Sequence, residues 1–442
     1  DPTRRRGNSG NPVCPSIAEG HVFIMEQMEE LFERLEGVGL DFLVYWPYDE
    51  GGCACDKCSP WGSNGFLKLS EELTRLARKH YPDIKTVLSD KARFSSEITL
   101  QPLRPIAPEV MERFKARGFS PRPTLSNNES DHHGPVRRVA QAAFSPRRNA
   151  KLEPYIRKLV NEAVDGFGSE KRADLVAQMV YELPALVLFK LLGIPEADVQ
   201  TIKMWADSRL VLSFGKPSVE EQLVAAGHMA DYWDYCLELV QQRIDSPQDD
   251  LPSDMLAMWR DGENIEVEDV NNVVFGLLLA GHETTTNMSA NAILTLLQDR
   301  EAWDAIVARP GLIPNTVEEC LRFRPSVVAW RRLTKTEVDV SGVTIPAGQR
   351  VLCYLPSGNR DEAYFDDGET FDIHRDNARS HIAFGFGRHF CLGAPLARFE
   401  LVVSLEELTK RLPGLRLAEN QDLMPVETVQ FRGPRELWVE WD

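Results

Sequence analysis

The feature that most constrains this chain is a glycine-rich loop around one cysteine. Residues 384–393 read Phe-Gly-Phe-Gly-Arg-His-Phe-Cys-Leu-Gly and stand directly before a segment, 394–412, that has the pattern of a helix. Glycine tolerates the backbone conformations that turn N–H groups toward a sulfur. The N-terminus of a helix favours negative charge and lowers the pKa of a thiol. The loop therefore predicts a stabilised Cys391 thiolate, and the simpler alternative is a small buried cysteine beside a turn.

A second motif lies inside an apolar stretch, Val270–Leu297, that is long enough for about seven helical turns. Residues 280–285 read Ala-Gly-His-Glu-Thr-Thr. Thr284 can bond to a carbonyl one turn earlier and locally open the helix, which would admit water. Glu283 can pass protons inward through that water. The simpler alternative is a threonine-rich helix segment with one solvated glutamate.

A third motif is a Glu-x-x-Arg pair, Glu319 and Arg322, followed by Arg375. Residues spaced by three face the same side of a helix. Alone, such a pair is usually a surface ion pair worth less than about 1 kcal/mol. Its position, upstream of the cysteine loop, favours a structural role.

In chain order, with residues 280–285 first, the Glu-x-x-Arg pair second and the cysteine loop last, these three motifs resemble the cytochrome P-450 family. The resemblance covers about residues 82–442, and residues 359–400 look close to the bacterial self-sufficient branch, whose haem domain is fused to a flavin and iron–sulfur reductase. The resemblance implies a mainly α fold with a small β-rich part. A long central helix would pass over haem b, and a cysteine-ligand loop would precede a C-terminal helix. Cys391 would be the thiolate ligand of the haem iron.

The resemblance also implies roles for individual residues. Glu283 and Thr284 would deliver protons, and Glu319 and Arg322 would lock onto Arg375 and brace the cysteine loop. The remaining residues expected to contact the haem are Ala280, Gly281, Phe384 and Gly385, together with His133, Arg137, Arg332 and His389 at the propionates. His132 and Arg331 remain neighbouring alternatives for two of these positions. The side chains expected to line a substrate pocket are Ile98, Leu100, Leu277, Val328, Trp330 and Val429.

The function implied is a haem-dependent monooxygenase that inserts one oxygen atom of O2 into a small apolar or aromatic substrate. Electrons would come from a ferredoxin- or flavodoxin-type donor or from a detached reductase domain. The arginines expected to form the donor's docking face are Arg137, Arg138, Arg147, Arg148, Arg388 and Arg398. The alternative is a non-catalytic haem-binding or gas-sensing module, which would have no need of Glu283 and Thr284.

Net charge and composition limit the possible partners and the cellular location of the protein. A net charge of −17 argues against nucleic acid as a partner. No apolar run reaches the length of about eighteen residues needed to span a membrane. Eight cysteines over 442 residues suggest a reducing compartment, so a cytoplasmic protein is expected.

The N-terminal part of the chain does not fit the family pattern. Residues 1–13 are polar and are expected to be a disordered tail. Residues 14–81 look like a fragment of bacterial barrel-type glycoside-hydrolase-like proteins, which leaves a carbohydrate-active function as a further alternative. Cys53, Cys55 and Cys58, with or without Cys14, could bind zinc or could be reduced thiols in a turn.

Overall fold

A computed structural model describes residues 84–442, except 104, 216, 341–342, 422, 424, 427 and 429. The expected tail (1–13), the atypical segment (14–81) with its candidate zinc ligands, and the candidate pocket residue Val429 therefore lie outside the described residues.

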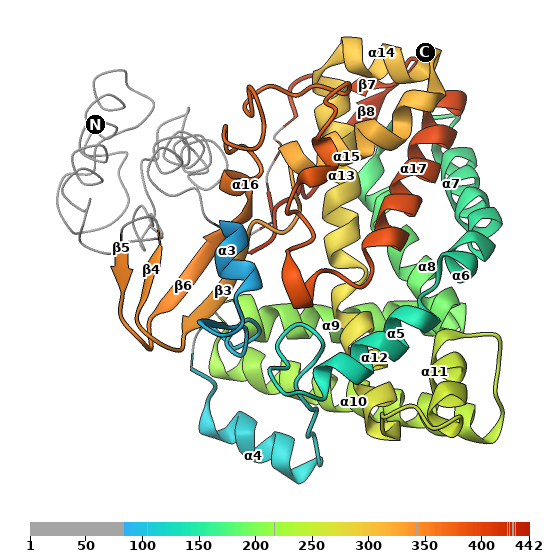
Figure 1. Cartoon of the computed structure of the whole chain (residues 1–442). Coiled ribbons are helices and arrows are strands. Elements are labelled where there is room, and N and C mark those ends of the chain that lie inside the picture. Colours follow the sequence, from blue (N-terminus) through green and yellow to red (C-terminus); the bar gives the residue numbers. More distant parts are fainter. Residues whose placement is uncertain are drawn as a thin grey trace, which may run out of the picture.

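Helices dominate the described chain, and Figure 1 shows them gathered on one side of a small group of strands. In chain order the α-helices are α3 (Ile84–Ser89), α4 (Pro108–Ala116), α5 (His133–Ala143), α6 (Pro146–Lys151), α7 (Glu153–Phe167), α8 (Leu183–Leu192), α9 (Val199–Phe214), α10 (Val219–Asp245), α11 (Leu251–Arg260), α12 (Val267–Ala280), α13 (Glu283–Gln298), α14 (Arg300–Ala308), α15 (Ile313–Phe323), α16 (Leu355–Gly358) and α17 (Ala394–Arg411).

The strands are short and pair antiparallel. One sheet has the order β1 (Phe94–Ser95), β3 (Ala329–Thr334) and β6 (Arg350–Tyr354), and a second has the order β2 (Arg172–Asp174), β8 (Trp438–Glu440) and β7 (Arg416–Leu417). A third pairs β4 (Val338–Val340) with β5 (Val343–Ile345). In the first sheet Trp330 stands opposite Cys353 and Arg332 opposite Val351. The mainly α architecture with a small β-rich part is as the sequence predicts.

The long apolar stretch forms the centre of the helical part, but as two helices rather than one. α12 ends at Ala280 and α13 begins at Glu283. The Thr284 hydroxyl donates to the Ala280 carbonyl oxygen at 2.8 Å, so a side chain satisfies a carbonyl that a backbone amide would otherwise satisfy. Every residue of α13 from Thr285 to Leu297 is buried, which is typical of a helix inside a core.

The neighbours of α13 hold the cysteine loop in place. α13 packs against α8, α15 and α17, and α17 packs against α7 and α15. The loop that carries Cys391 leads directly into α17, whose first turn contains Pro395, a residue suited to the start of a helix. Among the described residues, no helix is long and apolar enough to cross a membrane.

Candidate active site

One large cavity brings together most of the residues singled out in the sequence. Its walls come from α9, from the junction of α12 and α13, from β3 and from the cysteine loop. The predicted site residues that line it are Arg137, Ala280, Gly281, Glu283, Thr284, Arg332, Phe384, Gly385, His389 and Cys391.

The cysteine loop folds back on itself and directs Cys391 to the cavity. The Cys391 amide donates to the Phe384 carbonyl oxygen at 2.9 Å. Gly385 and Gly387 adopt φ values of +73° and +75°, which favour glycine. A Cβ on Gly387 would also lie 2.9 Å from the Ser89 Cα in α3, so this turn tolerates no larger residue without movement.

The electrostatics around the sulfur act in two directions. Burial raises the pKa of the Cys391 thiol, while the backbone N–H groups of Gly393 and Ala394 and the charge of Arg137 oppose that rise. These donors and this cation stabilise the thiolate. A metal ion at the sulfur would deprotonate it outright.

Two cations at the cavity have no acidic partner. Arg332 is buried, and it donates to the Thr99 hydroxyl at 3.3 Å and to the Arg331 carbonyl oxygen at 3.0 Å. Arg137 donates to the Phe390 carbonyl oxygen. Within the described part of the chain, neither guanidinium forms an ion pair with a carboxylate. A buried unpaired cation is costly, so both positions favour a negatively charged group in the cavity.

His389 completes this polar edge, but His133 does not reach it. His389 Nδ1 donates to the Leu125 carbonyl oxygen at 2.9 Å, and its Nε2 lies 2.9 Å from the Ser96 hydroxyl. His133 donates to the same carbonyl oxygen at 3.1 Å and stacks edge-on against His389, behind the cavity wall. His133 is not among the residues that line this cavity, and it lines a neighbouring pocket together with Arg137. Its position instead supports the ring of His389.

His132 and Arg331, the two alternatives that the sequence left open, do not line the cavity either. His132 Nε2 is 2.7 Å from an Asp269 carboxylate oxygen at the start of α12. Arg331 donates to the carbonyl oxygens of Thr99 and Gln101 at 2.9 and 2.6 Å. Strand alternation explains the second case, because Trp330 and Arg332 face the cavity and Arg331 points to the other side of β3.

These residues fit haem b. A cysteine sulfur with donated N–H groups, two guanidinium groups without carboxylate partners and the small residues Ala280 and Gly281 are what an iron porphyrin with two propionates requires. Gly281 also serves the packing of helices. A Cβ there would lie 2.7 Å from Leu188 Cδ2 in α8.

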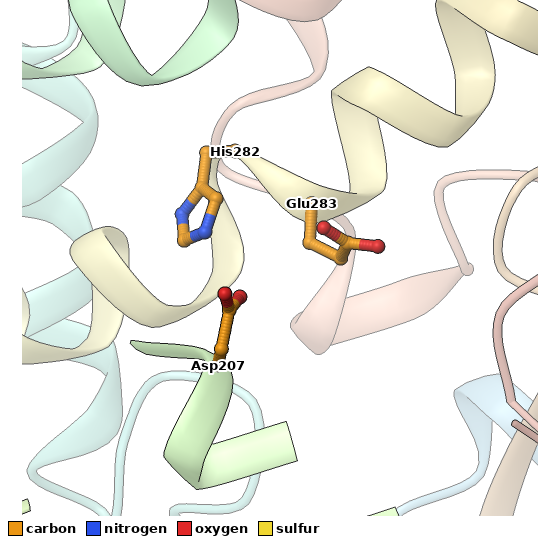
Figure 2. A group of neighbouring side chains, drawn as sticks. All are labelled: Asp207, His282 and Glu283. Carbon is orange, nitrogen blue, oxygen red and sulfur yellow. The ribbon is translucent and has the colours of Figure 1, made fainter. Parts of the chain in front are cut away.

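A buried polar group lies at the junction of α12 and α13. Figure 2 shows the Asp207 carboxylate pointing from α9 toward the His282 imidazole, with Glu283 beside them. The potential ligand atoms of the three residues lie within 4.8 Å of one another. His282 Nδ1 donates to the Leu278 carbonyl oxygen at 3.1 Å, which leaves the buried Nε2 as an unprotonated acceptor without a partner among the described residues.

The electrostatics of Asp207, His282 and Glu283 favour a role in proton transfer rather than in binding a metal ion. Burial raises the pKa values of Glu283 and Asp207 and lowers the pKa of His282 to about 3, so the neutral forms are favoured. The Lys203 ammonium acts on all three and donates to the Tyr181 carbonyl oxygen at 2.7 Å. The positive charge of a lysine disfavours a metal ion nearby, whereas carboxyl groups with raised pKa values beside an imidazole can exchange protons.

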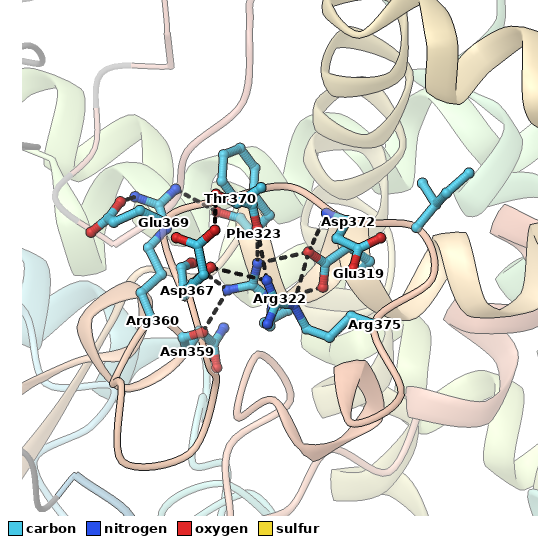
Figure 3. Close-up of polar contacts among 12 residues, drawn as sticks. Glu319, Arg322, Phe323, Asn359, Arg360, Asp367, Glu369, Thr370, Asp372 and Arg375 are labelled. Carbon is cyan, nitrogen blue, oxygen red and sulfur yellow. Dashed lines mark hydrogen bonds and ion pairs between the residues drawn. The ribbon is translucent and has the colours of Figure 1, made fainter.

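The Glu-x-x-Arg pair forms the centre of a buried network behind the cysteine loop, shown in Figure 3. Glu319 and Arg322 are fully buried and joined by two hydrogen bonds of 2.7 Å, and Arg375 Nε reaches a Glu319 oxygen at 3.3 Å. The same guanidinium groups donate to backbone carbonyl oxygens of Asn359, Gly368, Asp366, Asp367 and Thr370. The network thus fixes residues 359–375, which lead into the cysteine loop.

Only part of the expected substrate pocket lines the cavity. Leu100, Leu277 and Trp330 do so, whereas Ile98 and Val328 are buried elsewhere in the core. The pleat of β3 begins only at Ala329, and in the preceding irregular segment Val327 rather than Val328 faces the cavity.

Three polar residues of the site received no role from the sequence. Asp207 and Arg209 lie on α9, and His282 lies between α12 and α13. His282 lies inside the second motif, next to Glu283, and that position could have indicated a role in the site. α9 offers no such indication, because charged residues on a helix of mixed composition usually indicate a solvent-facing side.

The arginines expected to form a docking face differ in their availability. Arg147 is exposed, but Arg148 pairs with Asp254 and Asp249, and Arg398 pairs with Glu318. Arg138 pairs with Glu263, Arg388 donates to the Ser130 carbonyl oxygen, and Arg137 belongs to the cavity. The expectation of six available cations on one face is therefore too broad.

Comparison with known proteins agrees with this site. The family model described as cytochrome P-450 matches residues 310–424. Cyclomarin C epoxidase of Salinispora arenicola is 36% identical over 84% of this chain and 91% of its own length. The mycinamicin IV hydroxylase/epoxidase of Micromonospora griseorubida is 35% identical over 86% of this chain and 95% of its own.

Solved structures show the same fold. Cytochrome P-450 CREJ, in complex with (4-ethylphenyl) dihydrogen phosphate, has a TM-score of 0.80 and 35% identity over 84% of this chain and 96% of its own. An intact type IV self-sufficient cytochrome P-450 monooxygenase has a TM-score of 0.79 and 35% identity, over 84% of this chain but only 51% of its own. The chain belongs to the cytochrome P-450 family and is a haem-dependent monooxygenase.

Proposed function

We propose that residues 82–442 form one haem-thiolate domain in which Cys391 would bind the iron of haem b as a thiolate. Arg137, Arg332 and His389 would hold the propionates. The observation that carries this proposal is the single cavity that joins the Cys391 sulfur to two guanidinium groups without carboxylate partners. Glu319, Arg322 and Arg375 would hold the cysteine loop in the position in which Cys391 can reach the haem iron.

Proton delivery is the part of the reaction assigned to this chain's own side chains. The bound haem supplies the activation of O2 once electrons reach it. Asp207 and His282 would hold protons within reach of Glu283, and Glu283 would pass them to the Thr284 hydroxyl in the cavity. This order is supported by the short spacing of the three groups and by the favoured neutral forms of the two acids.

The substrate would have an apolar or aromatic body. Leu100, Leu277, Phe214 and Trp330 supply apolar walls to the cavity. Such walls exclude water and gain free energy from apolar contact.

Electrons would come from a ferredoxin- or flavodoxin-type protein or from a reductase domain supplied separately. Charge on the docking face mainly sets the rate of association. Arg147→Glu should therefore slow reduction most at low salt, and Arg309→Glu, after α14, serves as the control. Arg148 is unsuitable for this test because reversal would break its ion pairs with Asp249 and Asp254. Equal reduction rates for Arg147→Glu and the parent at low salt would place docking elsewhere.

Turnover with isotopically labelled O2 tests the proposed reaction. The haem-loaded protein is supplied with a ferredoxin and its reductase, NADPH, and a panel of alkylbenzenes, terpenes, alkylbenzoates and alkylphenyl phosphates. The expected product contains one labelled oxygen atom, and the second labelled atom appears in water. Reversible O2 binding without any oxidised product across the panel would instead favour a gas-sensing module.

A further inference from the structure

Arg209 places a positive charge in the wall of the substrate cavity. It lies on α9 with Leu210 and Phe214, which line the same cavity. Asp207 stands two residues earlier, and residues two apart point to different sides of a helix. The carboxylate of Asp207 is engaged with Tyr181 and Lys203 instead.

This guanidinium has no partner within the described part of the chain. No hydrogen bond or ion pair joins Arg209 to another described residue, and desolvation alone shifts its pKa, downward. Two other buried arginines are instead paired with carboxylates, Arg322 with Glu319 and Arg243 with Asp250. Glu283, an acidic residue of the cavity wall, receives a hydrogen bond from Asn287 at 2.9 Å.

Arg209 is also distinct from the cations that suit the haem propionates. Arg137 belongs to α5, Arg332 to β3 and His389 to the cysteine loop. α9 packs instead against α8, α10 and α12. Two propionates are already matched by two unpaired arginines, so the charge of Arg209 is left for another anion.

We propose that Arg209 binds an anionic group of the substrate, so that this enzyme acts on small molecules with an apolar body and one carboxylate or phosphate monoester. The inference rests on the proposed function. A guanidinium offers a planar pair of donors that matches either anion bidentately. The apolar walls of Leu277, Phe214 and Trp330 would contact the body of the same molecule.

Matched ligand pairs test this inference in the haem-loaded protein. Binding is measured by the change in the haem absorption spectrum and by calorimetry. One pair is para-butylbenzoate and para-butylbenzamide, and the other is para-butylphenyl phosphate and para-butylphenol. The parent should bind the anion of at least one pair more tightly than its neutral partner, and the preferred pair identifies the type of anion.

Variants at position 209 separate charge from packing. Arg209→Gln should weaken binding of the preferred anion by about 10- to 100-fold, as expected for loss of a charge-assisted contact, while the neutral partner changes by less than about twofold. Arg209→Lys should recover part of the loss. Arg138→Gln, which removes a surface arginine outside the cavity, should leave both affinities unchanged.

Thermal unfolding gives a second, ligand-independent result. Without a bound anion, Arg209→Gln should melt at or above the temperature of the parent, because it removes an unpaired cation. A lower melting temperature, equal losses for both members of a pair, or no binding of either anion overturns the inference. A protein that lacks the carbon monoxide spectrum of a haem thiolate would instead contradict the proposed function itself.

Discussion

At the scale of single residues, the reaction depends on where protons are held. Thr284 lies at the cavity, its hydroxyl bonded to the Ala280 carbonyl oxygen, and Glu283, whose pKa is raised by burial, lies next to it. Neither side chain is among those proposed to hold the haem. Substitutions here should therefore separate oxygen activation from cofactor binding.

We expect Thr284→Ala and Glu283→Gln to retain haem but to release most reducing equivalents as H2O2, because reduced oxygen leaves when protons do not arrive in time. The measurement is the ratio of H2O2 and product formed to NADPH consumed. Thr295→Ala is the matched control. Its hydroxyl makes the same type of bond, to the Asn291 carbonyl oxygen at 2.7 Å, about three turns further along α13. Full coupling in both test variants would show that the relay is assigned wrongly.

The buried imidazole at position 282 predicts a pH dependence of stability. Burial lowers the pKa of His282 from 6.5 to about 3. Below about pH 6.5 the unfolded chain therefore binds a proton that the folded chain does not. The free energy of unfolding should fall with decreasing pH, by about 1.4 kcal/mol per pH unit for this group. The stability that comes from burying the neutral His282 imidazole is fully present above about pH 6.5. It is lost progressively as the pH falls toward the folded-state pKa of about 3.

Urea unfolding between about pH 6.5 and 5 measures this slope. His282→Asn should reduce it by about one proton, and His374→Asn, an exposed position, serves as the control. A slope that is unchanged in His282→Asn would mean that the imidazole accepts a proton in the folded protein.

At the scale of elements, α15 and residues 359–375 act as one unit. Glu319 compensates the charges of Arg322 and Arg375 in a fully buried position. Removal of one partner from a buried group leaves uncompensated charge, which costs far more than the loss of an exposed pair. The cysteine loop depends on this unit for its position.

We therefore expect Glu319→Ala to lower the free energy of unfolding by about 3–5 kcal/mol and to abolish most haem incorporation. Haem content per protein and thermal unfolding measure both effects. Asp304→Ala is the control, because it breaks an exposed ion pair with Arg300 (2.6 Å) worth about 1 kcal/mol or less. A stable, fully haem-loaded Glu319→Ala protein would show that the Glu319 network is not needed for stability or for haem binding.

The sequence predicts some site residues and misses others, depending on whether a residue lies in a local motif or on a helix or strand whose orientation the sequence does not reveal. Cys391, Thr284 and Glu319 could be identified because each lies in a local motif whose spacing carries the chemistry. His133 and Val328 could not be placed, because one residue of difference in register moves a side chain to another face. Arg209 and Asp207 were missed because an inward-facing charge on α9 has the same local pattern as a solvated one.

At the scale of the whole molecule, one cavity joins segments far apart in the chain. α5, α9, the α12–α13 junction, β3 and the cysteine loop each contribute a wall, and the cavity's arginines without carboxylate partners among the described residues (Arg137, Arg209 and Arg332) come from three different elements. No single element forms the site. Catalysis as proposed therefore requires that Cys391 binds the haem within this shared cavity.

The carbon monoxide spectrum of the reduced protein tests this claim most directly. The parent should show the red-shifted band of a haem bound through a thiolate, and Cys353→Ala, which alters a buried cysteine of β6, should keep it. Cys391→Ala should lose that band. An unchanged band in Cys391→Ala, or its loss in Cys353→Ala alone, would contradict the assignment of Cys391 as the ligand.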